Sequence, residues 1–426
     1  MGFDRLKYTK AYKVLYRTYR FLTGRCYPTA MIYQSLYCLC HPVYQFYRGN
    51  LIGLDAYIQR HRIKKEILVS KEKLTIFNNA VWGEEAQSSP KAVIESPEVY
   101  ATELRNVFVY GGVNLMAVQE DIILPVFDDM TSGRWSYANR VLRMCTRKRG
   151  GIRHRKTSKS IDRALSLCGR VADNYYHFMV DILPKLALAE QQHLFAEYPV
   201  LVDDAVRKMP SMLEALELVN QSKREIIFVE SVESVQVKKL ACISEISRVP
   251  FDLLPGVRQI PEDFSISYQA LACMRKYISE IVPKGEYDKI YLARYKSGRP
   301  RLQNDEEIAM LCEKSGFQIV FPEKMTFTDQ MSLFRGAHFI IGCAGAAMTN
   351  TLFAEPGTEV YMIVPKVYQN SFWYTYMKNT GVQPLIVDAT ITHRARFVSA
   401  DLFEADINEF PQILESIKKQ DSSKSR

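Results

Sequence analysis

The stretch HFIIGCAGAAMTNTLFAEPGTEVYMIV, at residues 338–364, decides the fold class of this chain. Its first apolar run predicts a buried strand over 338–342, and its last predicts a second strand over 359–364. Between them, residues 346–353 are expected to form a helix. A strand, a helix and a strand in this order are typical of a parallel sheet covered by helices, so the predicted fold class is α/β.

Very small residues fill the turn between the first strand and the helix, at 342–347. Such a turn can bring free backbone N–H groups against phosphate oxygens at a helix N-terminus. It is not a GxGxxG dinucleotide fingerprint, and no GK[ST] of a Walker loop follows it. Small residues at a tight turn often serve packing alone, so this turn leaves both interpretations open.

The same alternation extends outward from this stretch in both directions. In the C-terminal half it predicts strands at 290–293 and 317–321 and helices at 305–315 and 327–336. In the N-terminal half it predicts helices at 174–191, 209–218 and 261–281, strands at 200–202 and 225–229, and short opening strands at 67–69, 74–77, 107–110 and 122–126. Two such series predict two parallel sheets.

Length and composition fit two domains of this kind. The chain has 426 residues, of which 47% are hydrophobic and 24% charged, as in an ordinary soluble globular protein. This length exceeds one ordinary core and suffices for two α/β domains. The expected division is a basic N-terminal arm at 1–65, an N-terminal Rossmann-like domain at 66–283, a C-terminal Rossmann-like domain at 284–399, and a C-terminal helix with a polar tail at 400–426.

The positive charge of the chain is concentrated in the arm. The formal net charge is +9, and residues 1–65 hold twelve Lys or Arg against Asp4 and Asp55. The remainder is nearly neutral, which argues against a nucleic-acid partner for the body of the protein. A helix predicted over 7–22 has one cationic face and one face of tyrosine and leucine. It either packs on the protein's own core or docks on an anionic membrane surface through residues 1–25.

Three further features bear on location and surface. The uncharged run at 26–47 contains too many polar residues and prolines for a good spanning helix, so a peripheral protein at the cytoplasmic, inner face of the cell membrane is expected. Nine cysteines, with no CxxC pair and no signal peptide before them, are expected to be reduced thiols. The basic segment 147–159 is expected to be an exposed loop, either near an anionic ligand or as a solvated linker.

The first group of residues that could carry chemistry is NYYHFMVD at 174–181. On a helix Asn174, His177 and Asp181 project from one face. A titratable base beside a carboxylate can deprotonate an acceptor hydroxyl. The alternative is a His–Asp pair that only braces a core helix, and Pro184 is expected to kink the helix.

The second group is the basic loop after the strand at 290–293. Arg294 follows the carboxyl end of that strand, where ligands bind in open α/β sheets, and Arg299 and Arg301 come next. Guanidinium groups there can hold a diphosphate bidentately. The alternatives are a solvated basic loop and, for Asn304 and Asp305, the N-cap of the following helix.

In order and spacing, three stretches resemble glycosyltransferase family 61: NYYHFMVDILPKL, YLARYKSGRPRLQNDEE and FPEKMTFTDQMSLFRGAHFIIGCAGAAMTNTLF. The resemblance covers about residues 169–388. It implies an inverting transferase of GT-B fold, in which two Rossmann-like domains face a cleft. The acceptor would lie mostly on the first domain and a nucleotide-sugar donor on the second, with no metal and no further cofactor.

The resemblance also implies roles for single residues. The acceptor side would use Asp181, favoured as base, with His177 and Asn174. The donor side would use Arg294, Arg299, Arg301, Asn304, Glu307, Gly345, Ala346, Ala347, Thr349 and Asn350.

Two positions depart from the family pattern, because Ala344 stands for a histidine and Ala293 for a serine. The predicted function is transfer of a sugar to a glycan or lipid-linked glycan acceptor in capsule or surface polysaccharide synthesis. The alternative, favoured by Ala344, is a catalytically impaired family member that acts as a glycan-binding or scaffold protein at the membrane.

Overall fold

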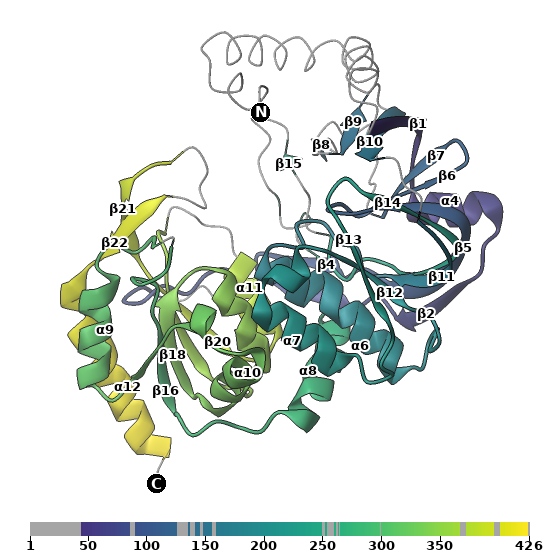
Figure 1. Cartoon of the computed structure of the whole chain (residues 1–426). Helices are drawn as coiled ribbons and strands as arrows, with labels where there is room; N and C mark the ends of the chain where they lie inside the picture. The colour runs from purple at the N-terminus through teal and green to yellow at the C-terminus, as the bar shows by residue number, and fades with distance from the viewer. Residues whose placement is uncertain are drawn as a thin grey trace, which may run out of the picture.

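The computed structural model describes residues 44–85, 90–125, 135–136, 141–144, 148–155, 159–248, 252–253, 260, 263, 265–298, 300–366, 372–395 and 401–424. The helix predicted at 7–22, the run at 26–47 up to residue 43, and Arg299 lie outside the described residues. The described part is a mixed α/β structure built around two large sheets (Figure 1).

The N-terminal half forms an eleven-stranded mixed sheet. Its strands are β1 (Tyr44–Gly53), β2 (Lys65–Val69), β5 (Val99–Tyr110), β6 (Leu115–Val118), β7 (Asp121–Leu124), β9 (Leu142–Met144), β10 (Arg149–Arg155), β11 (Ser160–Ser166), β12 (Val200–Asp203), β13 (Ile226–Val229) and β14 (Ser234–Ile243). Four neighbours, in the order β13-β12-β11-β14, run parallel. Numbered along the chain, these four strands have the 3-2-1-4 order of a doubly wound fold. The order in which successive strands are added to the sheet reverses between β11 and β14. We call the carboxyl ends of these two strands the first switch point.

The C-terminal half forms a five-stranded sheet in the order β17-β16-β18-β19-β20, and all its strands are parallel. The strands are β16 (Lys289–Leu292), β17 (Gln318–Val320), β18 (Phe339–Cys343), β19 (Glu359–Ile363) and β20 (Gln383–Val387). This is the 2-1-3-4-5 order of flavodoxin-like folds, which reverses between the first and third strands. The carboxyl ends of β16 and β18 are therefore the second switch point.

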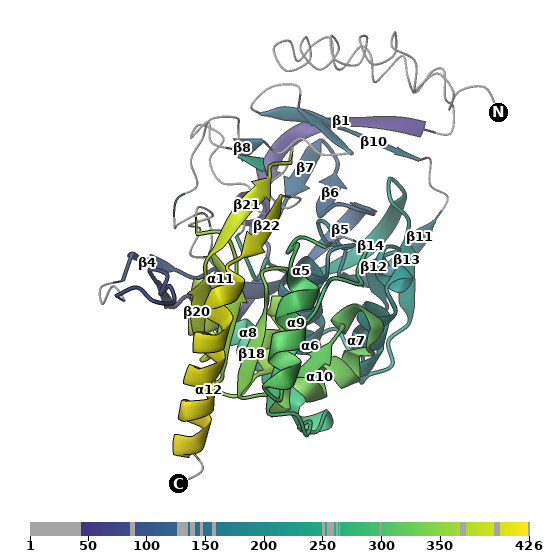
Figure 2. The same ribbon diagram turned by 90° about the vertical axis from the view of Figure 1, so that its left-hand side faces the viewer.

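Helices lie between the two sheets and on the outer face of the second (Figures 1 and 2). The outer pair is α9 (Asp305–Lys314) and α12 (Phe410–Lys424). The middle layer contains α6 (Leu183–Gln191), α7 (Pro210–Val219), α8 (Tyr268–Ile281), α10 (Phe327–Gly336) and the 3₁₀ helix η6 (Ala346–Phe353). Further elements are α4 (Leu54–His61), α5 (Tyr175–His177), the π segment η2 (Phe178–Ile182), η3 (Val206–Lys208), η5 (Pro322–Lys324), α11 (Phe372–Asn379), η8 (Ile407–Glu409), and the two-stranded pairs β3 (Lys73–Ile76) with β4 (Ala92–Glu95), β8 (Trp135–Ser136) with β15 (Asp252–Leu253), and β21 (Ala389–His393) with β22 (Leu402–Ala405).

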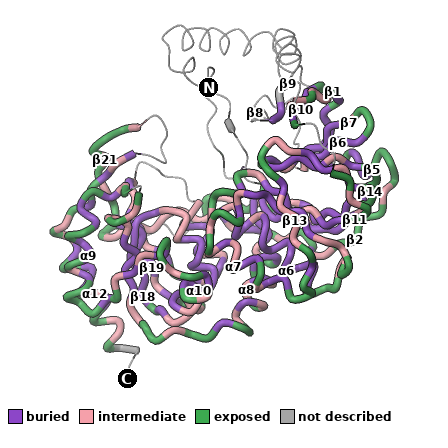
Figure 3. Tube along the Cα trace, in the orientation of Figure 1, coloured by how far each residue is buried: buried purple, intermediate pink, exposed green. Residues whose placement is uncertain are grey.

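One hydrophobic core extends from the first sheet to the second. Leu165 of β11 and Val200 of β12 belong to it, and so do Ile290 of β16 and Ile340 of β18. Because successive side chains of a strand point to opposite faces, Tyr291 faces a different core, which α9 and α12 complete. Figure 3 shows buried chain running through both sheets and the helices between them. The two halves therefore share this core, and each half also encloses cores of its own.

The first sheet is strongly curled. Tyr110, at the end of β5, pairs with Ser234 at the start of β14. Asn114 follows Tyr110 closely, yet its Nδ2 lies 2.5 Å from Oε1 of Glu245, just beyond the end of β14. A flat pair of strands of this length would hold these two residues far apart. The curl thus brings the chain after β5 to the first switch point.

The strands predicted between 174 and 364 are confirmed, and so are most of the helices, with ends shifted by one or two residues, but the ten-residue strand β14 was not predicted. Two predicted helices differ from the structure. The residues predicted as a helix at 346–353 form η6, which is a 3₁₀ helix. The helix expected at 261–281 begins only at Tyr268, because Ser267 caps it by accepting from the N–H of Ala270.

Three predictions about irregular or terminal segments are wrong. The basic segment 147–159 contains β10, because Gly151 leaves room for Phe46 of the neighbouring strand β1. Residues 44–53 of the predicted arm are β1 itself, a strand inside the first sheet. The helix expected over 400–419 starts only at Phe410, because 402–405 pair with β21.

Two properties concern the chain as a whole. Cys168, Cys242, Cys273, Cys312 and Cys343, the cysteines within the described part, are free thiols. In that same part, every helix is too short or too polar to span a bilayer.

Candidate active site

A continuous helical segment from Tyr175 to Gln191 carries the first group of candidate residues. Asn174 is its N-cap, since Oδ1 accepts a hydrogen bond from the N–H of Tyr176 at 2.9 Å. This is the usual task of asparagine at a helix start. Asn174, predicted as a catalytic residue, is exposed and orients the helix through its backbone.

His177 and Asp181 form a close pair on this segment. Nδ1 of His177 lies 2.8 Å from Oδ2 of Asp181, and their side chains are 17% and 14% exposed. A carboxylate in this position fixes the ring with its proton on Nδ1, so Nε2 carries the free lone pair. Nε2 has no hydrogen-bond partner in the part of the chain that the structure describes. The geometry thus makes Nε2 of His177 the atom able to accept a proton.

Asp181 is held from a second side. Its other oxygen, Oδ1, accepts a hydrogen bond of 2.5 Å from the hydroxyl of Ser247. Both carboxylate oxygens are therefore occupied, which suits Asp181 to orienting His177. The residue lies in η2, and π segments inside helices are frequent at functional sites.

A buried ion pair lies on the next turns of the same helical segment. Lys185 is 4% exposed, and its Nζ is 2.7 Å from Oε1 of Glu245. Asn114 also donates to this oxygen. Glu245 and Ser247 both follow the end of β14, so the segment after this strand contacts the helix twice. These residues gather at the first switch point.

The second switch point holds a guanidinium against a glycine. Arg294 follows β16 and Gly345 follows β18, and a Cβ placed on Gly345 would come within 2.6 Å of Nη1 of Arg294. A side chain at this position would force the guanidinium to move. Gly345 also precedes η6, whose first backbone N–H groups, at Ala346 and Ala347, have no acceptor within the helix. Positive charge and free N–H groups are therefore adjacent here.

Asp305 anchors the backbone beside Arg294. Its Oδ2 accepts from the Arg294 N–H at 2.6 Å, and its Oδ1 accepts from the Tyr291 hydroxyl at 2.5 Å. Burial raises the pKa of Asp305, and these hydrogen bonds counteract the rise. Asp305 was predicted as a helix cap, and the structure adds this second task.

Arg301 approaches the same region from the loop. Its Cζ lies 5.2 Å from the centre of the Phe403 ring, and its Nε donates to the carbonyl of Asp401 at 3.4 Å. Burial raises the pKa of the Cys343 thiol to about 11, while the charges of Arg294 and Arg301 act to lower it. The guanidinium of Arg294 lies at the turn after β18, and that of Arg301 lies over Phe403.

Of the other residues predicted on the donor side, three are buried and one is exposed. Asn304 is buried and pairs with Ala405, because its amide group donates to that carbonyl and accepts from that N–H. Thr349 and Asn350 are fully buried, and Glu307 is exposed on α9. Arg299 lies outside the described residues.

A hydrogen bond joins the two groups of candidate residues. The hydroxyl of Tyr175 donates to Oδ1 of Asn350 at 2.8 Å, and Nδ2 of Asn350 donates to Gln330 at 2.9 Å. Tyr175 is two residues from His177, and Asn350 lies in the helix that starts after Gly345. The short helix α5 packs against η6. The base and the cationic turn therefore belong to neighbouring elements.

The two positions that depart from the family pattern are both buried. Ala293 is 0% exposed and donates its N–H to the carbonyl of Val320, and Ala344 is 4% exposed and donates to Ile363. Their side chains have little surface to offer a ligand.

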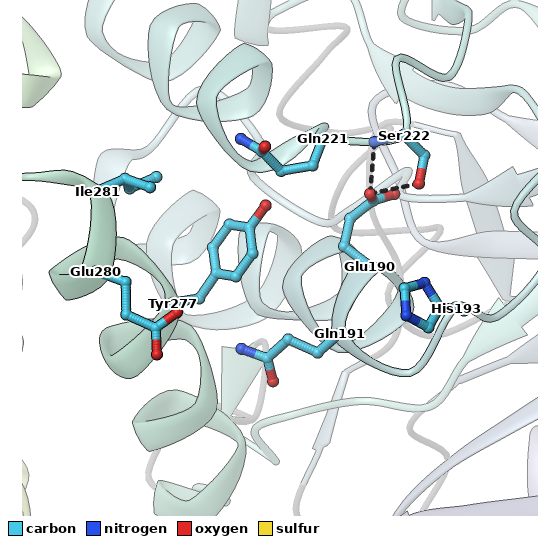
Figure 4. A pocket seen from close by; sticks show the side chains of 8 residues that line it. All are labelled: Glu190, Gln191, His193, Gln221, Ser222, Tyr277, Glu280 and Ile281. Carbon is cyan, nitrogen blue, oxygen red and sulfur yellow. Dashed lines mark hydrogen bonds between the residues drawn. The ribbon is translucent and has the colours of Figure 1, made fainter.

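A separate pocket of about 380 Å³ lies between the ends of α6, α7 and α8 (Figure 4). Its lining residues are Glu190, Gln191, His193, Gln221, Ser222, Tyr277, Glu280 and Ile281. Glu190 is the acceptor of two hydrogen bonds from Ser222 and of one from buried Arg224. None of the predicted site residues lines this pocket, and its carboxylates would repel a diphosphate. We therefore place the candidate site at the switch points.

Sequence reasoning missed Ser247, Glu245 and Lys185. No motif marks them, because a serine and a glutamate after a strand are common. The one usable signal was the position of Glu245 and Ser247. Both follow the apolar strand that ends at Ile243, and so they lie at the carboxyl edge of the first sheet.

Comparison with known families gives one match. Residues 175–361 match the model of the family described as Glycosyltransferase 61. The matched range begins at the helix of His177 and ends within β19. It contains the whole second switch point, and of the first it lacks only the end of β11. No curated protein matches the chain.

Proposed function

We propose that this chain, which carries a domain of glycosyltransferase family 61 and is a glycosyltransferase, moves a sugar from a nucleotide-sugar donor at the second switch point to an acceptor hydroxyl at the first. The observation that carries this proposal is the contact between α5 and η6, with the Tyr175–Asn350 hydrogen bond. It joins the element of the base directly to the element of the cationic turn.

On the acceptor side, His177 acts as the general base in this proposal. Nε2 takes the proton of the attacking hydroxyl, and Asp181 stabilises the imidazolium that forms. This assignment replaces the sequence-based preference for Asp181 as base, because both oxygens of Asp181 already accept hydrogen bonds. A positioned base of this kind contributes roughly 10²–10⁴-fold to a rate.

On the donor side, Arg294 and Arg301 hold the diphosphate. The bond from the acceptor oxygen to the anomeric carbon forms as the bond to the phosphate oxygen breaks, and the nucleoside diphosphate leaves with its electrons. The guanidinium groups and the N–H groups of Ala346 and Ala347 stabilise this developing charge. A single displacement of this type inverts the anomeric configuration.

The proposal includes a GT-B arrangement and independence from metal ions. The two strand orders, 3-2-1-4 and 2-1-3-4-5, support two Rossmann-like halves. Two arginines beside the leaving group support charge compensation by the protein. If this holds, an excess of EDTA leaves the transfer rate unchanged.

The product and location are also part of the proposal. We take the acceptor to be a glycan or lipid-linked glycan of a surface polysaccharide, on the basis of the sequence resemblance. The basic arm, which lies outside the described residues, would hold the enzyme at the cytoplasmic face of the membrane.

The second candidate function is a non-catalytic, glycan-binding protein, and Ala344 favours it. The position of Arg294 opposes it, because the approach to Gly345 puts a guanidinium beside the turn that precedes η6. Donor binding separates the two, since a ligand that binds the folded state raises its stability.

The test uses the purified full chain with a panel of nucleotide sugars and a membrane extract as acceptor. We expect at least one donor to raise the melting temperature and to release nucleoside diphosphate only when acceptor is present. Failure of every donor to bind would contradict the transferase. Binding without release would favour the non-catalytic candidate.

A further inference from the structure

Ser247 lies beside the candidate base pair without touching His177. Its hydroxyl donates to Oδ1 of Asp181 at 2.5 Å, and Oδ2 of the same carboxylate faces Nδ1 of His177 at 2.8 Å. A carboxylate with a donor on each oxygen cannot rotate without losing one hydrogen bond. The orientation of the imidazole therefore depends on a residue that is 70 positions away in the chain and 5% exposed.

The serine is itself held firmly. The preceding residue, Ile246, accepts from the N–H of Ser267 at 2.9 Å, and Arg248 donates to the carbonyl of Ser265 at 2.8 Å. On its other side Glu245 accepts from buried Lys185 and from Asn114. Backbone hydrogen bonds on both sides of Ser247 therefore hold it in place at the first switch point.

The helix supplies the matching constraint. Asp181 lies within the π segment Phe178–Ile182, whose neighbours Met179 and Val180 are completely buried. The backbone of Asp181 therefore cannot shift to restore a lost contact. The side chain of Asp181 could still rotate, and the hydrogen bond from Ser247 opposes that rotation.

We infer that Ser247 is a positioning residue that sets the carboxylate of Asp181, and through it the ring of His177, for proton transfer. This inference rests on the proposed function, in which His177 is the base. The serine takes no part in bond making. It contributes by keeping Nε2 of His177 directed at the acceptor, because a small misplacement of a base costs a large factor in rate.

The test compares Ser247→Ala with Ser244→Ala. Ser244 is a matched control because it lies in the same segment, is 7% exposed, and uses its hydroxyl only for the backbone of Tyr100 and Glu98. We expect Ser247→Ala to lower kcat about tenfold, with the KM for donor and the donor-induced melting shift unchanged. Ser244→Ala should change the melting temperature but not kcat. Ser247→Thr, which keeps the donor, should restore most of the rate.

Equal values of kcat for Ser247→Ala and Ser244→Ala would overturn the inference. If the alanine variant does not fold, Ser247→Cys and Ser244→Cys take their places, since a thiol is a weak donor of similar size. His177→Ala is measured in parallel. A fully active His177→Ala would refute the proposed base itself, whereas an inactive one together with an active Ser247→Ala would refute only the role of the serine.

Discussion

The two switch points differ sharply in chemistry although the fold builds them by the same rule. The first carries a histidine, carboxylates and a serine hydroxyl in two hydrogen-bonded groups, His177–Asp181–Ser247 and Lys185–Glu245. The second carries arginines, a glycine and helix N–H groups, at Arg294, Arg301 and Gly345–Ala347. Strand order fixes where ligands can bind, and the residues after the strands decide which charge the ligand must have.

The two sites also differ in how their side chains are fixed. At the first, side chain binds side chain, so that each residue depends on its neighbour. At the second, a carboxylate anchors the backbone, because Asp305 accepts from the N–H of Arg294, whose guanidinium lies against Gly345. Changes at the first site should therefore affect proton transfer, and changes at the second should affect donor binding.

His177→Ala should have the largest effect and should distinguish the role of the first site from that of the second. We expect kcat to fall about 10³-fold, because the base is lost, while the affinity for donor stays the same. Steady-state kinetics and donor titration measure both. His338→Ala removes a histidine with a similar carboxylate partner, Asp288, on the exposed surface, and should leave both values unchanged. A weaker donor affinity in His177→Ala would mean that the two sites are not separable.

Arg294→Ala is the converse change. Loss of a charged donor to a phosphate should weaken donor binding about 30-fold, by isothermal titration, with the unfolding transition retained. Arg163→Ala, which removes a surface arginine paired with Glu197, is the control. Unchanged donor affinity in Arg294→Ala would remove the diphosphate assignment.

Gly345→Ala tests the geometry of the second site instead of its charge. The added methyl group would meet the guanidinium of Arg294 at 2.6 Å and displace it, so donor affinity should fall about tenfold. Gly298→Ala, in the nearby loop, is the control, because nothing lies within 4 Å of its Cβ. Equal affinities in the two variants would show that the contact between arginine and glycine is irrelevant to binding.

Tyr175→Phe probes the link between the sites and should have the smallest effect. It removes the hydrogen bond to Asn350, which we expect to lower the free energy of unfolding by about 1 kcal/mol and kcat less than about threefold. Chemical denaturation and kinetics measure these quantities. Tyr277→Phe removes a hydrogen bond to the carbonyl of Val219 away from both sites, and should affect stability alone.

The sequence predicted well whatever depends on local periodicity. Most strands and helices from 174 to 364 follow from apolar spacing, and Phe327–Gly336 agrees to the residue, although β14 was not predicted. The positions of Arg294 and Gly345 were also predictable, because Arg294 directly follows a predicted strand and Gly345 lies in the turn after another. The curl of the first sheet was not, since β1 and β10 pair across roughly 100 intervening residues and no local pattern records this partnership.

The hydrogen-bond partners of polar side chains also could not be predicted from local sequence patterns. Asn304 was assigned to the donor, yet its amide pairs with the backbone of Ala405, 101 positions away. Asn350 was assigned to the same ligand, yet it binds Tyr175. A polar residue in a motif can serve the ligand or the fold, and only the tertiary contacts distinguish these tasks.

The hydrophobic core that both sheets share has a consequence for how such enzymes can be recombined. Leu165 and Ile340 belong to one interior, so a donor half transplanted from a relative would meet a surface shaped for another neighbour. Chimeras joined near residue 284 should be poorly soluble unless α8 and α10 travel together, and calorimetry of the intact chain should give one melting transition for both halves.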